Sequence, residues 1–343
     1  MTAGAHTMKQ AMFQEPKEGN KVLCGLCSHR CLISPGHRGI CAVRENRDGT
    51  LVSLVYDRII ARNIDPIEKK PLFQFLPGSL SFSIATAGCN FRCKHCQNAD
   101  ISQLPRERGG MVPGEPVTPA EIVASALKYR CASISYTYTE PTIFFELAYE
   151  TAKLAREKGL KNVFVTNGYI TPEALREIRP YLDAANIDLK GYTDDFYKNV
   201  CGARLQPVLD SIRLYKELGI WIEITTLVIP GHNDSDGELG QIASFVRSVG
   251  AEIPWHVTRF HPTYKLTDQP PTPLGTLKRA RQIGLDAGLR YVYEGNIPGE
   301  GEETFCWKCR RSLVKRFGFS VQENHVKNGK CGSCGAKIDG LWE

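Results

Sequence analysis

The chain has 343 residues, of which 42% are hydrophobic and 23% charged, and its formal net charge is +6 at pH 7. This composition is that of a globular protein large enough to bury a core, and no apolar run approaches the eighteen or so residues that a membrane helix needs. We therefore expect no membrane span, and so mild a positive charge does not by itself indicate a nucleic-acid partner.

The N-terminal region begins with residues 1–20, which lack the apolar stretch of a secretory signal, so we expect a loose polar tail and a cytoplasmic protein. In that reducing compartment, thirteen cysteines indicate metal binding rather than a disulfide framework. Residues 21–79 are predicted to be a small cysteine-rich metal-binding segment followed by a linker. Its cysteines fit structural zinc or an auxiliary iron–sulfur cluster equally by count, with zinc slightly favoured, and have the spacing C-x2-C-x3-C-x9-C: Cys24, Cys27, Cys31 and Cys41. His29 and His37 are expected to be loop residues rather than ligands.

The main domain is predicted at residues 80–300, where apolar, β-branched runs alternate with amphipathic stretches of helical period, the pattern of consecutive βα units. Thr118 and Thr171, each followed by proline, predict helix starts, and Gly159 predicts a helix end. We predict an α/β fold, a partial (βα)6-type TIM barrel with small cysteine-rich units at both termini and an active site at the C-terminal ends of its strands. A doubly wound open sheet is the alternative. The predicted strands are 80–86, 132–138, 161–166, 184–189, 221–229 and 255–260, with 290–295 as a seventh candidate.

The loop after the first of these strands contains Cys89, Cys93 and Cys96 with the spacing C-x3-C-x2-C. Three thiolates suit an iron–sulfur cluster, whereas a structural zinc site is ordinarily closed by a fourth ligand. His95 could complete a zinc site, but it adjoins Cys96, and neighbouring residues do not easily share one tetrahedral centre. We therefore predict a 4Fe-4S cluster with one iron open to another molecule.

The C-terminal unit, residues 301–343, has the spacing C-x2-C-x21-C-x2-C in Cys306, Cys309, Cys331 and Cys334. This spacing is typical of a zinc ribbon, with rubredoxin-like iron as the alternative metal, and the metal would stabilise a segment too small to build its own core. A zinc-ribbon nucleic-acid-binding protein is the alternative from a different functional class. Cys131 and Cys201 remain single and are interpreted as small buried hydrophobes, with Cys201 a weak candidate for the active site.

A family resemblance joins these motifs. The stretch 88–98 (GCNFRCKHCQN) resembles the cluster-binding loop of the radical S-adenosylmethionine (SAM) superfamily. Residues 137–141 (TYTEP) resemble its Gly-Gly-Glu-type element, with tyrosine and threonine in place of the glycines, which implies that Glu140 meets the amino group of the cofactor's methionine moiety. Residues 165–168 (VTNG) resemble the element that reaches the ribose and carboxylate, giving Thr166 and Asn167.

The stretches 188–190 (DLK) and 259–262 (RFHP) match the group of the pyruvate formate-lyase activating enzyme, which implies that Asp188, Lys190 and His261 contact the cofactor. In that group an aspartate usually precedes the TNG element, and Val165 occupies the position here. Each proposed contact follows the C-terminal end of a predicted strand, and a barrel would gather such residues on one face.

Four further stretches resemble the radical SAM enzymes of the AmmeMemoRadiSam system: 65–72, 201–212, 227–234 and 259–266. The resemblance implies that a reduced cluster cleaves SAM to a 5′-deoxyadenosyl radical, which abstracts hydrogen from an unidentified substrate. It implies reduced ferredoxin or flavodoxin as electron donor and Memo-like and AMMECR-type proteins as partners. A glycyl-radical-enzyme activase is the alternative. Such activases often carry extra cysteines after the triplet, whereas here the extra cysteines lie at the termini, which favours an enzyme that works with a Memo-like partner.

Overall fold

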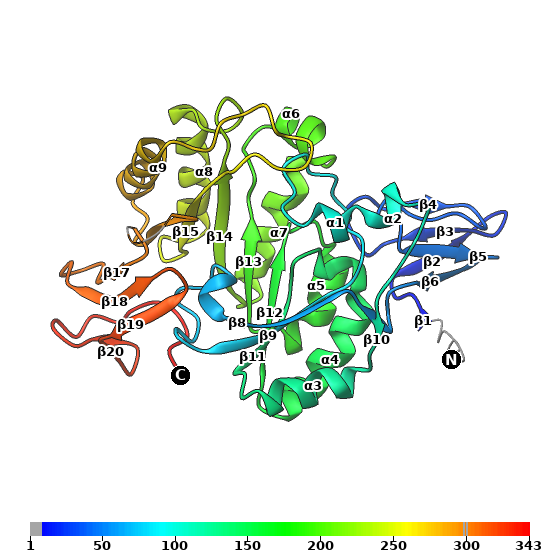
Figure 1. Cartoon of the computed structure of the whole chain (residues 1–343), viewed down its shortest axis with the longest axis horizontal. Helices are drawn as coiled ribbons and strands as arrows, with labels where there is room; N and C mark the ends of the chain where they lie inside the picture. The colour runs from blue at the N-terminus through cyan, green and yellow to red at the C-terminus, as the bar shows by residue number, and fades with distance from the viewer. Residues whose placement is uncertain (1–8, 298, 300) are drawn as a thin grey trace. The chain divides into compact units, whose positions relative to one another are not determined.

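The computed structural model describes residues 9–297, 299 and 301–343, and Figure 1 shows the chain as a ribbon. The chain divides into two compact units. The first comprises residues up to 64, 81–92 and 98–183, and the second comprises 65–80, 93–97 and 184–343. Among the described residues, no helix combines the length and apolar character needed to cross a bilayer.

The first unit contains three parallel strands, β9 (Leu80–Ala85), β11 (Ser133–Tyr136) and β12 (Lys161–Thr166). β11 lies between the other two, with Ile134 opposite Phe82 on one side and Asn162 on the other. Most of their side chains are buried, as expected for parallel strands whose two faces are both covered. The predicted strands at 80–86, 132–138 and 161–166 are confirmed.

The helices of this unit begin where the sequence places them. Thr118 caps α3 (Pro119–Lys128) with a capping box, and Thr171 caps α5 (Pro172–Ile178) by accepting from the backbone N–H of Ala174. Gly159, with φ 76°, follows the end of α4 (Phe145–Glu157). The shorter helical segments are α1 (Ala99–Ser102), α2 (Leu104–Glu107), η2 (Pro141–Phe144) and η3 (Arg179–Tyr181).

The N-terminal segment forms two small antiparallel sheets, β1-β6-β5 and β2-β3-β4. The expectation of a loose tail over residues 1–20 is wrong for its described part, because residues 9–17 include strands β1 and β2; residues 1–8 lie outside the described residues. Partners distant in sequence hold this segment: the backbone N–H of Met12 donates to Glu146 at 2.7 Å, and Arg44 pairs with the same buried carboxylate at 3.0 Å. The strands are β1 (Lys9–Gln10), β2 (Gln14–Lys17), β3 (Lys21–Cys24), β4 (Leu32–Ile33), β5 (Arg44–Arg47), β6 (Thr50–Ser53), and the paired β7 (Arg58–Ile59) and β10 (Glu115–Pro116).

The second unit contains four parallel strands in sequential order: β13 (Ala184–Asp188), β14 (Trp221–Val228), β15 (Trp255–Arg259) and β16 (Val292–Gly295). They confirm the predictions at 184–189, 221–229 and 255–260 and the seventh candidate at 290–295. The connecting helices are α6 (Asp194–Phe196), the π-helical η4 (Tyr197–Cys201), α7 (Leu205–Glu217), α8 (Asp236–Val249) and α9 (Leu274–Asp286). Strand β8 (Ala61–Pro66) and η1 (Ile67–Lys69) lie at the start of the predicted linker.

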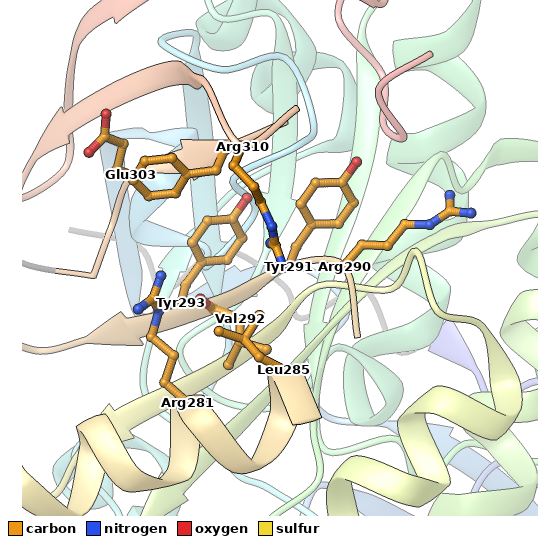
Figure 2. Close-up of a pocket in the computed structure, with 9 residues that line it drawn as sticks. Arg281, Leu285, Arg290, Tyr291, Val292, Tyr293, Glu303 and Arg310 are labelled. Carbon is orange, nitrogen blue, oxygen red and sulfur yellow. Dashed lines mark hydrogen bonds between the residues drawn. The ribbon is translucent and has the colours of Figure 1, made fainter. Parts of the chain in front are cut away.

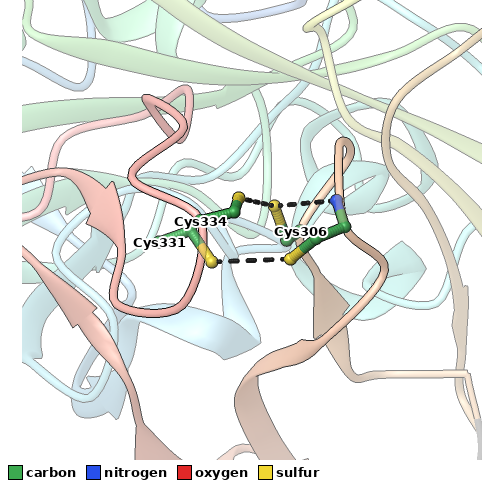
Figure 3. Close-up of side chains that lie close together, drawn as sticks. Cys306, Cys331 and Cys334 are labelled. Atoms are coloured by element: carbon green, nitrogen blue, oxygen red, sulfur yellow. Dashed lines mark hydrogen bonds between the residues drawn. The ribbon is translucent and has the colours of Figure 1, made fainter.

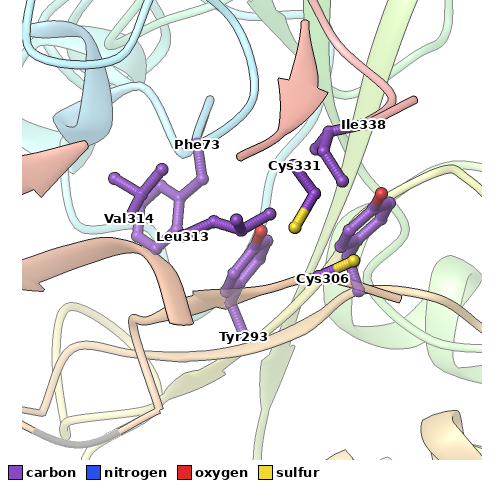
Figure 4. Packing of buried hydrophobic residues seen from close by; sticks show 8 residues of the cluster. Phe73, Tyr293, Cys306, Leu313, Val314, Cys331 and Ile338 are labelled. Carbon is purple, nitrogen blue, oxygen red and sulfur yellow. The ribbon is translucent and has the colours of Figure 1, made fainter. Parts of the chain in front are cut away.

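The C-terminal segment is a small antiparallel sheet, β17 (Thr304–Phe305), β18 (Ser312–Phe317) and β19 (Ser320–Asn324), followed by the β20 (Val326–Lys327) and β21 (Lys330–Cys331) pair. A compact apolar cluster lies beneath it in the second unit (Figure 4). Its members come from the predicted linker, from β16 and the residue just before it, and from the cysteine-rich segment: Phe73, Tyr291, Tyr293, Cys306, Leu313, Val314, Cys331 and Ile338.

Candidate active site and metal centres

The cysteine loop begins directly after β9, and its first part belongs to the first unit. Gly88 has φ 99°, and a Cβ atom there would lie 2.7 Å from Cγ1 of Val43, so the turn into the loop requires glycine. The half-buried Cys89 accepts a hydrogen bond at Sγ from the backbone N–H of Phe91 at 3.4 Å. Its carbonyl accepts from Arg106 Nη2 at 2.5 Å. Both ends of the Cys89 residue are therefore fixed.

Asn90, which sequence reasoning passed over, connects this loop to the end of β12. Its Oδ1 accepts a hydrogen bond from Asn167 Nδ2 at 2.7 Å, and its side chain is fully buried. Among the described residues, Asn90 Nδ2 has no hydrogen-bond partner. A buried amide left without a partner is destabilising, so this N–H group is available to donate to an acceptor from outside the protein. The only sequence signal was its position beside Cys89.

Glu140 holds the ends of two neighbouring strands together. Its Oε1 accepts from the hydroxyls of Thr166 at 2.7 Å and Thr142 at 2.6 Å, and its Oε2 accepts from the backbone N–H of Asn167 at 2.8 Å. Burial raises the pKa of this carboxyl even though each of these bonds lowers it. Both oxygens thus have protein partners, and the visible role of Glu140 is to fix Thr166 and Asn167.

Tyr138 and Thr139 occupy the positions where the superfamily element has glycines. Tyr138 has φ 62°, in the left-handed region, so the backbone adopts a glycine-like conformation without glycine. Its carbonyl accepts from Asn98 Nδ2 at 2.8 Å, and the Thr139 hydroxyl donates to the carbonyl of Thr86 at 2.9 Å. These bonds tie the turn to segments on either side of the cysteine loop.

The second part of the cysteine loop belongs to the second unit and contains Cys93 and Cys96. The backbone N–H of Cys96 donates to the Cys93 carbonyl at 3.2 Å, and that of Lys94 donates to the carbonyl of Val200 at 2.9 Å. The loop is thereby fastened to η4. As a result Cys93, His95 and Cys201, all buried, have ligand atoms within 4.8 Å of one another.

The end of β13 carries a second polar group beside these thiols. Lys190 Nζ donates to Asp188 at 2.7 Å, and the backbone N–H of Lys190 donates to the Tyr197 hydroxyl at 3.1 Å. Burial lowers the pKa of Lys190, but the charges of Asp188, Cys93 and Cys201 and the hydrogen bond to Asp188 together outweigh burial and raise this pKa above its ordinary value. Lys190 is therefore a fixed positive charge at neutral pH. His261 follows β15 and is exposed.

The N-terminal cysteines surround a tight loop after β3. The backbone N–H of Cys24 donates to the carbonyl of Cys31 at 2.9 Å, and that of Ile40 donates to Cys31 Sγ at 3.5 Å. Burial, and then the charges of Cys24 and Cys41, raise the pKa of Cys27. The four thiols are therefore close enough to interact electrostatically. Among the described residues, however, their four sulfurs do not all lie within 4.8 Å of one another.

This N-terminal loop is bonded to the segment that follows Asn167. The backbone N–H of Ser28 donates to the carbonyl of Tyr169 at 2.9 Å, and that of Thr171 donates to the carbonyl of Leu26 at 3.1 Å. His29 Nε2 lies 2.9 Å from the carbonyl oxygen of Asn90, and its ring centroid is 4.8 Å from that of Tyr169. These are mainly backbone contacts, which carry no residue signature, so sequence reasoning missed them.

The C-terminal cysteines converge in the second unit (Figure 3). The sulfurs of Cys306 and Cys334 are 3.6 Å apart, and those of Cys309 and Cys331 are 3.8 Å apart. Four thiolates about 2.3 Å from a tetrahedral zinc ion have sulfurs about 3.8 Å apart. The backbone N–H of Cys309 donates to Cys306 Sγ at 3.5 Å, as in a zinc knuckle. The set has the dimensions of a closed tetrahedral metal site.

A cavity of about 270 Å³ lies beside this segment (Figure 2). Two of the arginines that line it have acidic partners: Arg290 pairs with Asp339 at 2.9 Å, and Arg281 lies 3.9 Å from Glu294. None of the predicted cofactor contacts lines it. The lining residues are Arg281, Leu285, Arg290, Tyr291, Val292, Tyr293, Glu303, Phe305 and Arg310.

Known proteins resemble this chain, one of them over nearly its whole length. Residues 83–241 match the family model of the radical SAM superfamily. The chain is 49% identical to the uncharacterized protein MJ0808 of Methanocaldococcus jannaschii, covering 97% of this chain and 99% of that protein. It is 21% identical to the pyruvate formate-lyase 1-activating enzyme of Escherichia coli strain K12, covering 60% of this chain and 89% of that enzyme.

The fold is similar to a radical SAM methyltransferase from Sphaerobacter thermophilus, with a TM-score of 0.51 and 16% identity over 65% of this chain and 68% of the other. The predicted α/β class, with parallel strands typical of the partial radical SAM barrel, is confirmed, as is the C-terminal four-cysteine cluster.

Proposed function

Since this chain belongs to the radical SAM superfamily and is a radical SAM enzyme, we propose that Cys89, Cys93 and Cys96 hold its 4Fe-4S cluster and leave one iron open for SAM. Membership of the family implies both the cluster and SAM. When bound, they supply a 5′-deoxyadenosyl radical, made by one-electron reduction of the sulfonium, which takes a hydrogen atom from the substrate. The protein's own residues bind, orient and exclude water.

The residues of the cysteine loop suit such a group. Soft thiolates are the ordinary ligands of iron–sulfur clusters, and a backbone N–H already points at Cys89 Sγ. The unpartnered Nδ2 of buried Asn90 offers a donor to an acceptor of the bound cofactor. This orphaned donor beside the cysteine loop is the observation that carries the proposal.

We assign the predicted SAM contacts to two roles. Thr166 and Asn167 face the cofactor from the end of β12, and Glu140 positions them through its hydrogen bonds. Asp188 and Lys190 form an ion pair at the end of β13 that holds the lysine charge for the cofactor, and His261 contributes from the loop after β15. A rigid set of this kind would hold SAM in one orientation, and such positioning lowers the activation barrier.

The substrate class is the finer part of the proposal. We favour an enzyme of the AmmeMemoRadiSam type, which modifies a small molecule or a protein together with a Memo-like and an AMMECR-type partner and receives electrons from reduced ferredoxin or flavodoxin. The similarity to the pyruvate formate-lyase 1-activating enzyme favours a second candidate, a glycyl-radical activase. A glycine-centred radical signal in a co-expressed partner, seen by electron paramagnetic resonance, would select the activase.

We further propose structural zinc at the C-terminal cysteines, because their sulfur separations match a tetrahedral zinc site. At the N-terminal cysteines we propose zinc or an auxiliary iron–sulfur cluster. Metal analysis of the anaerobically purified protein, before and after reconstitution with iron and sulfide, distinguishes these assignments.

The central test compares reconstituted wild type with Cys93→Ala. The variant is expected to lack the reduced-cluster paramagnetic signal and to form no 5′-deoxyadenosine with dithionite and SAM. The matched control is Cys131→Ala, a buried cysteine outside the three sets, which should behave as wild type. Formation of 5′-deoxyadenosine by Cys93→Ala at the wild-type rate would refute the assignment.

A further inference from the structure

Cys201, a cysteine outside the three predicted metal sets, lies against Cys93. The Sγ atoms of the two residues lie within 4.8 Å of each other, and both side chains are buried. No sequence pattern links them, since more than a hundred residues separate them.

The backbone explains why the two thiols meet. Cys201 ends the π-helical turn η4 (Tyr197–Cys201), which is closed by Gly202 with φ 72°. The hydrogen bond from Lys94 N–H to the Val200 carbonyl, 2.9 Å long, joins the residue after Cys93 to the residue before Cys201. A π-helical turn is uncommon and is frequently found at functional sites, where it re-aims a side chain.

The surroundings of the thiol pair are polar and fixed. His95, which is 4% exposed, has a ligand atom within 4.8 Å of both sulfurs, and its Nδ1 has no hydrogen-bond partner among the described residues. The ion pair of Lys190 with Asp188 is also close to these thiols, and both of its charges interact electrostatically with Cys93. Cys201 therefore lies in a polar group around one thiol of the cluster loop and is more than a small apolar filler.

We infer that Cys201 is a positioning residue that donates an S–H hydrogen bond to the Cys93 sulfur and so raises the reduction potential of the cluster. This inference rests on the proposed function, in which Cys93 is a cluster ligand. Hydrogen bonds to cluster sulfurs are among the factors that set the potential, because they stabilise the extra negative charge of the reduced state. Without the donor, the cluster becomes harder to reduce while its ligands stay in place.

The experiment measures the reduction potential of the cluster. If Cys201 had only a structural role, a hydroxyl donor at this position would not be expected to restore that potential. Wild type, Cys201→Ala, Cys201→Ser and the control Cys131→Ala are reconstituted, poised at a series of potentials and examined by electron paramagnetic resonance. We expect Cys201→Ala to keep wild-type iron and sulfide content. At a fixed potential its ratio of reduced to oxidised cluster should fall about tenfold, equivalent to about 59 mV for one electron. Cys201→Ser, which keeps a hydroxyl donor, should recover part of the loss, and Cys131→Ala should match wild type.

Two outcomes overturn the inference and leave the proposed function standing. An unchanged potential in Cys201→Ala with a full cluster would show that the thiol does not tune it. Loss of iron from Cys201→Ala, as expected for Cys93→Ala, would make Cys201 a ligand instead of a donor. A full cluster in Cys93→Ala is the different result that refutes the proposed ligand set, and the inference with it.

Discussion

The four-cysteine sets at the two ends of the sequence have the same donor atoms but different surroundings. The C-terminal set brings four sulfurs within 4.8 Å and packs on its own apolar cluster (Figure 4). The N-terminal set has no such closed arrangement among the described residues, but its loop is bonded to Tyr169 and Thr171 and to the carbonyl of Asn90. A metal bound by the C-terminal set would stabilise the segment that contains it. A metal bound by the N-terminal set would in addition hold residues beside the cysteine loop in place. Ligand number alone therefore does not tell what a metal site does.

The largest expected effect comes from removing the C-terminal metal with Cys306→Ser combined with Cys309→Ser. Structural zinc contributes on the order of 10 kcal/mol of apparent binding free energy in small domains, so β17 to β19 should lose their order. Hydrogen exchange should report lost protection over residues 304–324, and metal analysis should report one zinc fewer. The rate of 5′-deoxyadenosine formation should stay within about twofold of wild type; a tenfold fall would erase the contrast between the two sets.

Cys27→Ser tests the N-terminal set. Loss of its metal should loosen the loop that bonds Tyr169 and Thr171, so residues 166–171 should exchange faster. We expect 5′-deoxyadenosine formation to fall about tenfold, equivalent to about 1.4 kcal/mol in the activation free energy. Unchanged exchange over 166–171 after confirmed metal loss would show that the two segments are independent.

Glu140→Gln tests the anchor of the same strand-end residues. The amide keeps the shape but loses the carboxylate charge and turns an N–H group toward a donor, so about 2 kcal/mol of unfolding free energy should be lost. Urea unfolding of wild type, Glu140→Gln and the exposed control Glu177→Gln measures this difference. A stability equal to that of the control would mean that the three hydrogen bonds described above, and a fourth from the backbone N–H of Thr142 at 3.1 Å, together make no net contribution to stability.

The smallest effect is expected for His29→Ala, which removes one hydrogen bond to the Asn90 carbonyl and the ring contact with Tyr169. The loss should be about 1 kcal/mol of unfolding free energy. His37→Ala is the matched control, since the His37 ring nitrogen Nδ1 lies 2.9 Å from the carbonyl oxygen of Pro35, only two residues away in the sequence. Equal stabilities of the two variants would show that the His29 contacts do not help to hold the N-terminal loop against the cysteine loop.

The sequence predicted the parallel strands well, because their buried β-branched runs and the proline-capped helices between them are local signals. It also placed Thr166 and Asp188 at strand ends, where β12 and β13 do end. It failed where distant backbone decides the outcome. Strands β1 and β2 pair with residues further along the chain, and a polar segment of this kind has no pattern of its own.

The site shows the same limit. Cys201 was discounted because a single cysteine is usually a buried hydrophobe, and only the turn of η4 brings it to Cys93. Asn90 was overlooked because an asparagine beside a ligand is an ordinary loop residue until its partner Asn167 is in view. The proposed cofactor contacts other than the cysteines stay predictions, since they rest on resemblance and placement.

The left-handed conformation of Tyr138 has a consequence for recognising related chains. Holding a tyrosine at φ 62° costs about 1–2 kcal/mol that glycine would avoid, while its hydroxyl accepts from Asn63 Nδ2 at 3.1 Å, a contact that glycine could not make. A sequence search for the glycine pair misses this turn. A search for the backbone conformation finds it, and would also find other chains in which a side chain has replaced the glycine of this element.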